Sequence, residues 1–125
     1  MNWIAVDLDG TLAECDGRVN LARIGKPVAS MVERVKRWRA EGKCVKIFTA
    51  RMTDHGLHDL NGGRVDALTP IRDWCREHLG EALPVTNVKD FGMVELWDDR
   101  CVQVVPNTGI RASANPHSVN ELTTP

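Results

Sequence analysis

The chain has 125 residues, of which 42% are hydrophobic, and its formal net charge at pH 7 is −1. That length fits one domain with one core, and the near-neutral charge excludes an overall field that would attract nucleic acid or a membrane. No apolar stretch approaches the roughly 20 residues that span a bilayer, and no basic-then-apolar segment marks a signal peptide. We therefore expect a cytoplasmic protein without membrane contact. The oligomeric state is left open.

The first third of the chain predicts a strand, a loop and a helix. The apolar run Trp3–Leu8 ends in acidic and glycine residues, which is typical of a buried strand that stops at a turn. Residues 12–26 are mixed in character and contain two glycines, so we expect a loop there. From Pro27 to Gly42, apolar residues recur every three or four positions, which indicates a helix with one buried face.

The middle of the chain repeats this order. Cys44–Thr49 has the character of a strand, and the polar, glycine-bearing residues 51–63 predict a loop. A second apolar stripe predicts a helix over about Arg64–Leu79. Thr69-Pro70 leaves two possibilities open, because this pair suits either the true start of the helix or a kink inside it.

The last third predicts three short strands, Val85–Val88, Met93–Trp97 and Cys101–Val105, followed by a polar C-terminal tail of uncertain order over residues 106–125. Alternating strands and helices predict an α/β fold. We expect a Rossmann-like three-layer sandwich, in which a mostly parallel five-stranded sheet carries helices on both faces.

Cysteines and tryptophans are expected to be structural. The four cysteines form no Cys-x-x-Cys pair, which predicts reduced thiols and no zinc knuckle. Cys44 and Cys101 fall within expected strands and are predicted core residues. Trp38, Trp74 and Trp97 fall on apolar stripes or strands, so we expect them in the core too.

Acidic and polar side chains follow several of the expected strands. Asp7-Leu8-Asp9-Gly10-Thr11 follows the first strand, Thr49 the second, and Asp98-Asp99 the fourth, while Lys89 lies just after the third. The carboxyl ends of parallel strands share one edge of a sheet, where ligands bind. Close carboxylates are costly without a cation or a shared proton, and Mg²⁺ prefers carboxylates together with phosphate oxygens.

These residue types suit phosphoryl transfer. The hydroxyl of Thr49, the backbone amide and guanidinium of Ala50-Arg51, and the charge of Lys89 are groups that neutralise a transferring phosphoryl group. A carboxylate can act as the nucleophile, and a second carboxylate two residues later can serve as general acid and base.

In their order and strand context, these motifs resemble the four motifs of phosphatases of the haloacid dehalogenase (HAD) superfamily. The resemblance covers about Trp3 to Val105 and implies that residues 1–105 form a single HAD-like catalytic domain. It further implies that Asp7 is the nucleophile and that Asp9 is the general acid and base, both also contributing to a Mg²⁺ site.

The same resemblance gives roles to the later motifs. It implies that Thr49 and Lys89 bind and neutralise the phosphoryl group, and that Asp98 and Asp99 complete the metal site. Gly10, Thr11 and Ala50 join the predicted phosphate- and substrate-binding residues.

Two tripeptides are also similar to the small phosphatase domain of phage polynucleotide kinase-phosphatases. They are Thr49-Ala50-Arg51 and Asp98-Asp99-Arg100, and they make Arg51 and Arg100 candidates for phosphate contact or support. No Gly-x-x-x-x-Gly-Lys-Ser/Thr loop occurs, so the kinase half has no counterpart. The family inserts a cap after the first motif or between the second and third. The short spacers here predict a capless, open site.

The sequence therefore predicts a magnesium-dependent phosphohydrolase that cleaves phosphate monoesters through an aspartyl-phosphate. A nucleotide or polynucleotide end is one expected substrate, and a small metabolite such as a sugar phosphate is another. A phospho-ligand binding domain without turnover and a receiver domain are the competing classes. His55 and His58 are interpreted as loop-surface or substrate-contact residues, with a second metal site as the alternative.

Overall fold

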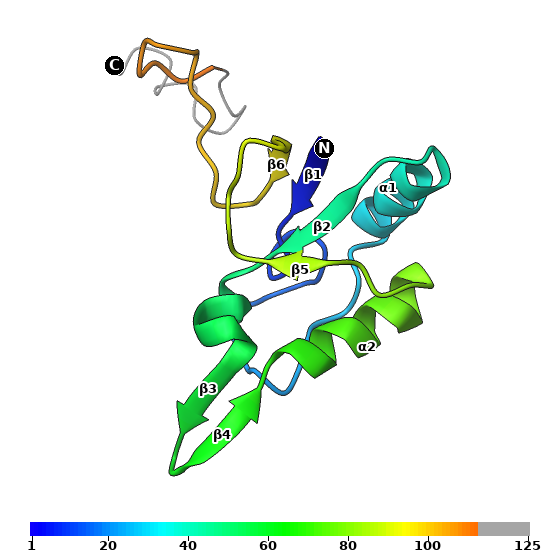
Figure 1. The fold of residues 1–125 in the computed structure, drawn as a ribbon, viewed down its shortest axis with the longest axis vertical. Coiled ribbons are helices and arrows are strands. Elements are labelled where there is room, and N and C mark those ends of the chain that lie inside the picture. The colour runs from blue at the N-terminus through cyan, green and yellow to red at the C-terminus, as the bar shows by residue number, and fades with distance from the viewer. Residues whose placement is uncertain (113–125) are drawn as a thin grey trace.

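The computed structural model describes residues 1–112. Figure 1 shows two helices beside a small twisted sheet, and a separate two-stranded hairpin that projects away from the sheet beyond one of the helices. In chain order the elements are β1 (Trp3–Val6), α1 (Ala29–Ala40), β2 (Val45–Phe48), the 3₁₀ helix η1 (Ala50–Gly56), β3 (Leu57–Leu60), β4 (Gly63–Asp66), α2 (Leu68–Leu79), β5 (Val85–Thr86) and β6 (Met93–Trp97). No helix within residues 1–112 is both long and apolar enough to cross a bilayer.

The main sheet has four parallel strands in the order β5-β2-β1-β6. All four side chains of β1 are buried, as expected for an interior strand of a parallel sheet. Ile4 lies opposite Val45 of β2 and Glu95 of β6, and the β1–β6 pairing has a register shift between Trp3 and Ile4. The predicted mixed α/β fold with a mostly parallel sheet is confirmed, and this order places the end of β1 between those of β2 and β6.

Both helices pack on the same face of this sheet. Ile4 and Val6 of β1 belong to one core cluster with the apolar stripes of α1 and α2. In the same cluster, the Trp38 and Trp97 rings meet edge to face, 5.2 Å apart between centroids. The members of the stripes are Met31, Val32, Val35 and Trp38 from α1, and Ile71, Trp74, Cys75 and Leu79 from α2. The predicted core role of Trp38 and Trp74 is confirmed, whereas Trp97 is partly buried and packs against the core.

Within residues 1–112, the opposite face carries a loop where the three-layer prediction expected helices. Residues 87–92, between β5 and β6, are too few for a crossover helix, which needs a dozen residues or more. This segment lies against Trp3, whose indole Nε1 donates to Asp90 Oδ1 at 2.8 Å. The Lys46 ammonium covers the same ring, 4.5 Å from its centroid.

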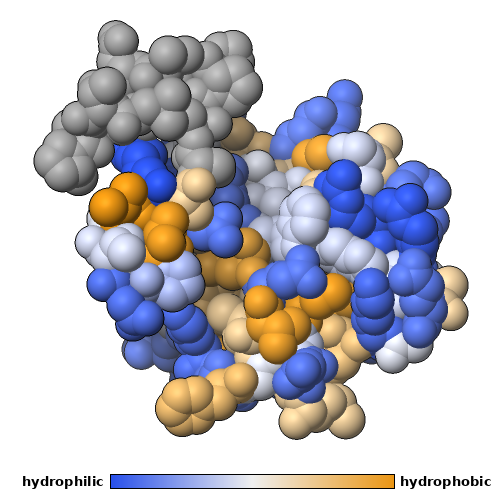
Figure 2. All heavy atoms as spheres, turned by 90° about the horizontal axis from the view of Figure 1, so that it is seen from above, coloured by the Kyte–Doolittle hydropathy of each residue, from blue (hydrophilic) through white to orange (hydrophobic). Residues whose placement is uncertain are grey.

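The fifth predicted strand does not join the sheet. Residues 101–105 lie outside the four strands, and Val104 makes an isolated antiparallel bridge to Arg111. The cause lies just after β6, where the Arg100 amide donates to Asp98 Oδ1 at 2.8 Å and turns the chain away (Figure 1). Cys101 is therefore exposed, contrary to the prediction, and Val102 is 55% exposed. The face in Figure 2 shows hydrophobic groups among hydrophilic ones.

The segment before α2 also differs from the prediction. The expected loop and first helical turn form η1 and an antiparallel hairpin, in which Leu60 pairs with Gly63. Asn61 and Gly62 both have positive φ, 49° and 80°, which suits the two-residue turn between twisted strands. Asn-Gly is a strong hairpin signal, and the apolar stripe of the helix masked it.

Helix α2 begins at Leu68, so Thr69-Pro70 marks its first turn and not a kink. The side chain of Asp66 caps this end, because its Oδ1 accepts hydrogen bonds from the amides of Leu68 at 2.8 Å and Thr69 at 3.3 Å. Pro70 is tolerated here because the first-turn amides have no acceptor within the helix. Of the predicted tail, residues 113–125 lie outside the described residues.

We expect Asp66→Ala to lower the melting temperature by a few degrees, because two amides lose their acceptor. Hydrogen bonds from Thr69 and Leu68 lower the pKa of Asp66 below its ordinary value of 3.8. The capping stabilisation is therefore present above about pH 4 and is lost as the pH falls. Thermal unfolding followed by circular dichroism tests this. The control is Asp73→Ala on the same helix, where only a 3.2 Å surface pair with Arg76 is lost. Equal melting temperatures for Asp66→Ala and wild type at pH 7 would contradict the capping role.

Candidate active site

The candidate site lies where β1 ends, and the turn that follows is tightly built. Leu8 and Leu12 are fully buried and anchor it. Between them, the Gly10 amide donates to the Ala13 carbonyl at 2.8 Å, and Gly10 has a φ of 92°. A Cβ added to Gly10 would come within 2.5 Å of Asp99 Oδ2 and would displace that carboxylate, and the positive φ favours glycine here as well.

Three carboxylates meet beside this turn. One oxygen from each of Asp7, Asp98 and Asp99 lies within 4.8 Å of the others. The strand pairing explains this meeting, because β6 runs parallel to β1 and the Asp7 amide donates to the Trp97 carbonyl at 2.9 Å. The Thr11 hydroxyl joins them, lying 3.4 Å from an oxygen of Asp7 and of Asp99 and accepting from the Asp99 amide at 3.0 Å.

This acidic cluster is electrostatically strained. Burial raises the pKa of Asp7 to about 7, and the charge of Asp98 followed by that of Asp99 adds to the rise. None of the ion pairs within residues 1–112 involves these three aspartates. Carboxylates held close without a basic partner suit a hard divalent cation, so Asp7, Asp98 and Asp99 could hold Mg²⁺.

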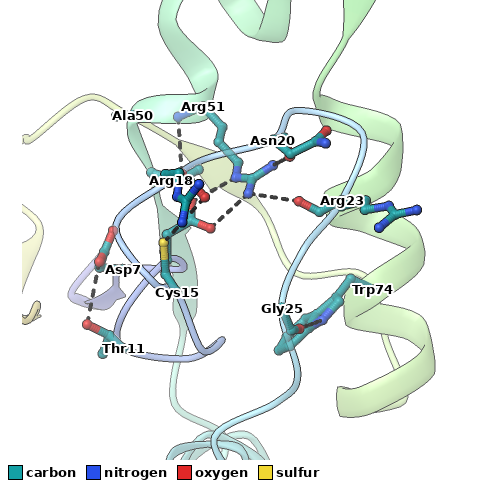
Figure 3. Close-up of polar contacts among 12 residues, drawn as sticks. Asp7, Thr11, Cys15, Arg18, Asn20, Arg23, Gly25, Ala50, Arg51 and Trp74 are labelled. Carbon is teal, nitrogen blue, oxygen red and sulfur yellow. Dashed lines mark hydrogen bonds and ion pairs between the residues drawn. The ribbon is translucent and has the colours of Figure 1, made fainter.

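Asp9 is oriented differently from these three. Its two carboxylate oxygens accept from Nε and Nη2 of Arg51, at 2.8 Å each, and its carboxylate is not part of the acidic cluster. In Figure 3, Asp7 and Thr11 lie to one side of the Arg51 guanidinium. Asp9 still lines the same cavity as Asp7, so the two carboxylates flank one space.

Arg51 is buried and its guanidinium has internal partners. Besides Asp9, Nη1 donates to the Asn20 carbonyl and Nη2 to the Arg23 carbonyl, at 3.0 Å each. Arg51 is 4% exposed and is not among the residues that line the cavity beside Asp7. Of its two predicted roles, phosphate contact or support, this placement favours support.

Thr49 begins η1 at the end of β2, and its side chain is 3% exposed. Its hydroxyl oxygen accepts from the Arg51 amide at 3.1 Å. The hydroxyl proton can therefore be donated to a ligand in the cavity that Thr49 lines.

The cavity has a volume of about 550 Å³, within the range of small-molecule sites. The predicted site residues that line it are Asp7, Asp9, Gly10, Thr49, Ala50, Asp98, Asp99 and Arg100. Sequence reasoning missed six others, which are Cys15, Gly17, Val19, Phe48, Thr53 and Asn87. Asn87 directly follows β5, which ends at Thr86, but the predicted strand Val85–Val88 enclosed it and so hid its strand-end position. The loop residues carry no such signal.

Lys89 and the two histidines lie apart from this cavity. Lys89 is exposed in the loop between β5 and β6 and does not line the cavity, so its contact with a phosphoryl group stays a prediction. The His58 ring nitrogen Nε2 lies 3.1 Å from the Arg51 carbonyl. In the part of the chain that the structure describes, neither His55 nor His58 belongs to a metal-ligand cluster.

Comparison with known proteins identifies a fold and no chemistry. No protein-family model and no curated protein sequence matches the chain. Among solved structures, the chain is similar to a conserved protein coded by a locus of Bacteroides thetaiotaomicron, with a TM-score of 0.55 over 83% of this chain and 80% of that one. The sequence identity is 23%. The two proteins therefore share a fold, and function has to be argued from the site itself.

We expect Asp7→Asn to stabilise the metal-free protein at pH 8 and to have a smaller effect at pH 5. The pKa of Asp7 is raised from 3.8 to about 7 in the folded protein. Between these two pH values, the folded protein therefore holds a proton that the unfolded protein has released. This stabilisation is present at low pH and is lost as the pH rises through about 7, whereas asparagine has no charge to bury. Melting temperatures in EDTA at both pH values test this.

Two comparisons complete that test. Asp59→Asn, at an exposed hairpin carboxylate, should leave the pH dependence of the wild type unchanged. Mg²⁺ should raise the melting temperature of the wild type at pH 8 more than that of Asp7→Asn. If the Asp7→Asn and wild-type melting temperatures differ by the same amount at pH 5 and pH 8, the electrostatic account is wrong.

Proposed function

We propose that this chain is a magnesium-dependent phosphohydrolase of the HAD type, which cleaves phosphate monoesters through an aspartyl-phosphate. The observation that carries the proposal is the meeting of Asp7, Asp98 and Asp99 within 4.8 Å, beside the cavity that Asp9 and Thr49 also line. A nucleophile, a second carboxylate, a hydroxyl donor and an acidic metal site thus surround one space.

Asp7, Asp98 and Asp99 would hold the cation, which when bound offsets negative charge on phosphoryl oxygens. The negative charge of this cluster also affects the protonation of Asp7. A carboxylate with its pKa raised to about 7 is half protonated near neutrality, and a neighbouring positive charge would favour the ionised, nucleophilic form.

The reaction then has two steps. Asp7 attacks phosphorus, the ester P–O bond breaks, and Asp9 donates a proton to the departing oxygen. Asp9 next takes a proton from water, which attacks the same phosphorus, breaks its bond to Asp7 and releases inorganic phosphate. The step returns both carboxylates to their starting states. The position of Asp9 on the same cavity as Asp7 supports this division of roles.

The remaining lining residues suit binding of the phosphoryl group. The Thr49 hydroxyl already accepts one hydrogen bond and keeps its proton to donate to a phosphoryl oxygen. Arg100 places a guanidinium at the cavity wall, next in sequence to the acidic cluster. Guanidinium groups pair readily with phosphate oxygens, which supports Arg100 as the phosphate contact.

The lining beyond the phosphate residues favours a nucleotide over a sugar phosphate. Val19 and Phe48 offer apolar surface on the cavity wall, while Thr53 and Asn87 offer hydrogen-bonding groups. A nucleotide has a flat base and a polar ribose that match such a lining. A sugar phosphate is polar throughout and would leave the apolar surface without a partner.

The purified protein should release phosphate from an aryl phosphate in the presence of Mg²⁺, and EDTA should stop the release. Asp7→Asn should abolish turnover, because the amide is no nucleophile, while circular dichroism shows an intact fold. Asp73→Asn, at an exposed helix position, is the matched control and should keep full activity. Full activity of Asp7→Asn would exclude the covalent mechanism. Mg²⁺ binding without turnover of any substrate would favour the non-catalytic alternative.

A substrate panel separates the possible substrates. We expect the highest kcat/KM among nucleotides and 3′-phosphorylated oligonucleotides, and a lower value for sugar phosphates, because only the former fill the apolar wall. Phe48→Ala should lower kcat/KM for the best nucleotide by about tenfold and change that for a sugar phosphate little. A higher kcat/KM for sugar phosphates, or an equal loss on both in Phe48→Ala, would contradict the nucleotide preference.

A further inference from the structure

Arg51 joins two parts of the site that lie far apart in the sequence. Its guanidinium donates to both carboxylate oxygens of Asp9 and to the backbone carbonyls of Asn20 and Arg23. Figure 3 shows these bonds spreading from one buried side chain. The Arg51 side chain is 4% exposed, and its guanidinium donates four charge-assisted hydrogen bonds to internal partners.

The pairing with Asp9 fixes a direction as well as a distance. A guanidinium that meets a carboxylate with two parallel hydrogen bonds holds it in one plane, which a lysine ammonium cannot do. The two bonds are 2.8 Å each, and the Asp9 side chain is 16% exposed. Without Arg51, the Asp9 carboxylate would have no other side-chain partner among residues 1–112 and would be free to change rotamer.

The two carbonyl bonds extend this order to the cavity wall. Asn20 and Arg23 belong to the irregular segment between β1 and α1, which also carries Val19 of the cavity lining. A second side chain holds this segment from α2, because Trp74 Nε1 donates to the Gly25 carbonyl at 3.0 Å. Trp74 holds the segment without contacting Asp9, whereas Arg51 holds both.

We infer that Arg51 is a positioning residue for proton transfer by Asp9 and makes no contact with the phosphoryl group. The inference rests on the proposed function, in which Asp9 protonates the leaving oxygen. By holding the Asp9 carboxyl group in one orientation beside the cavity that Asp9 lines, Arg51 serves the step in which the ester bond breaks. The same bonds keep the wall that carries Val19 at a constant place relative to Asp9.

The dependence of kcat/KM on the leaving group distinguishes a positioning role of Arg51 from a purely structural role. A dinitrophenolate departs without a proton, whereas an alkoxide requires one, so only alkyl phosphates need a well-placed acid. The informative quantity is kcat/KM, because it excludes hydrolysis of the aspartyl-phosphate, which follows departure of the leaving group. For Arg51→Gln we expect kcat/KM to fall about 100-fold on an alkyl phosphate and less than about tenfold on 2,4-dinitrophenyl phosphate, since general acid catalysis contributes about 10²–10⁴-fold.

Three comparisons complete the test. Trp74→Phe loosens the same segment and leaves the partners of Asp9 in place, so both substrates should be affected equally. Arg51→Lys keeps the charge without the two parallel bonds and should show the same unequal loss as Arg51→Gln. If Arg51→Gln shows no cooperative thermal unfolding, the Arg51→Lys variant alone is used to test the positioning role. The inhibition constant of inorganic phosphate should be the same in both Arg51 variants and the wild type.

Each contrary result has a distinct meaning. An equal loss on both substrates in the Arg51 variants, matching Trp74→Phe, would show that Arg51 acts only through the fold and would overturn the inference. An inhibition constant for phosphate that rises tenfold or more, on the order of one lost charged hydrogen bond, would show direct phosphate contact and overturn it as well. If the wild type hydrolyses neither substrate, the proposed function itself fails, and the inference fails with it.

Discussion

Repulsion among the carboxylates of Asp7, Asp98 and Asp99 is the constraint on which the candidate site depends. Their oxygens lie within 4.8 Å of one another because β1 and β6 pair in parallel and end together. Burial and the neighbouring charges raise the pKa of Asp7 to about 7. A fold retains such an arrangement at a cost in stability, and a bound cation is the simplest group that offsets it.

The two carboxylates of the first motif show how environment separates two identical side chains. Asp7 shares its surroundings with two acids and has no cationic partner among the described residues, whereas Asp9 is paired on both oxygens with buried Arg51. One is thereby suited to a metal and to attack, and the other is held in a defined orientation. Thr49 caps η1 by accepting a hydrogen bond from the Arg51 amide, and the Arg51 side chain reaches Asp9 just after β1.

Few elements surround the candidate site in this fold. Both helices cover one face of a four-stranded sheet, and a six-residue connection runs over the other. Part of the cavity wall comes from the irregular segment before α1, which hydrogen bonds from Arg51 and Trp74 hold in place. This part of the wall has no regular secondary structure, and Arg51 ties its position to the orientation of Asp9.

The sequence by itself determined the strands whose side chains are buried, the helices with a continuous apolar stripe, and the acidic residues at strand ends. These features are local, because periodicity and strand-end position are properties of neighbouring residues. The fifth strand and the exposed Cys101 show the limit, since alternating valines predict a strand but a turn at Arg100 removes them from the sheet. Only the tertiary structure decided that both helices share one face and that Arg51 pairs with Asp9. The Arg51–Asp9 pair joins residues 42 positions apart, and its formation depends on how the whole core packs.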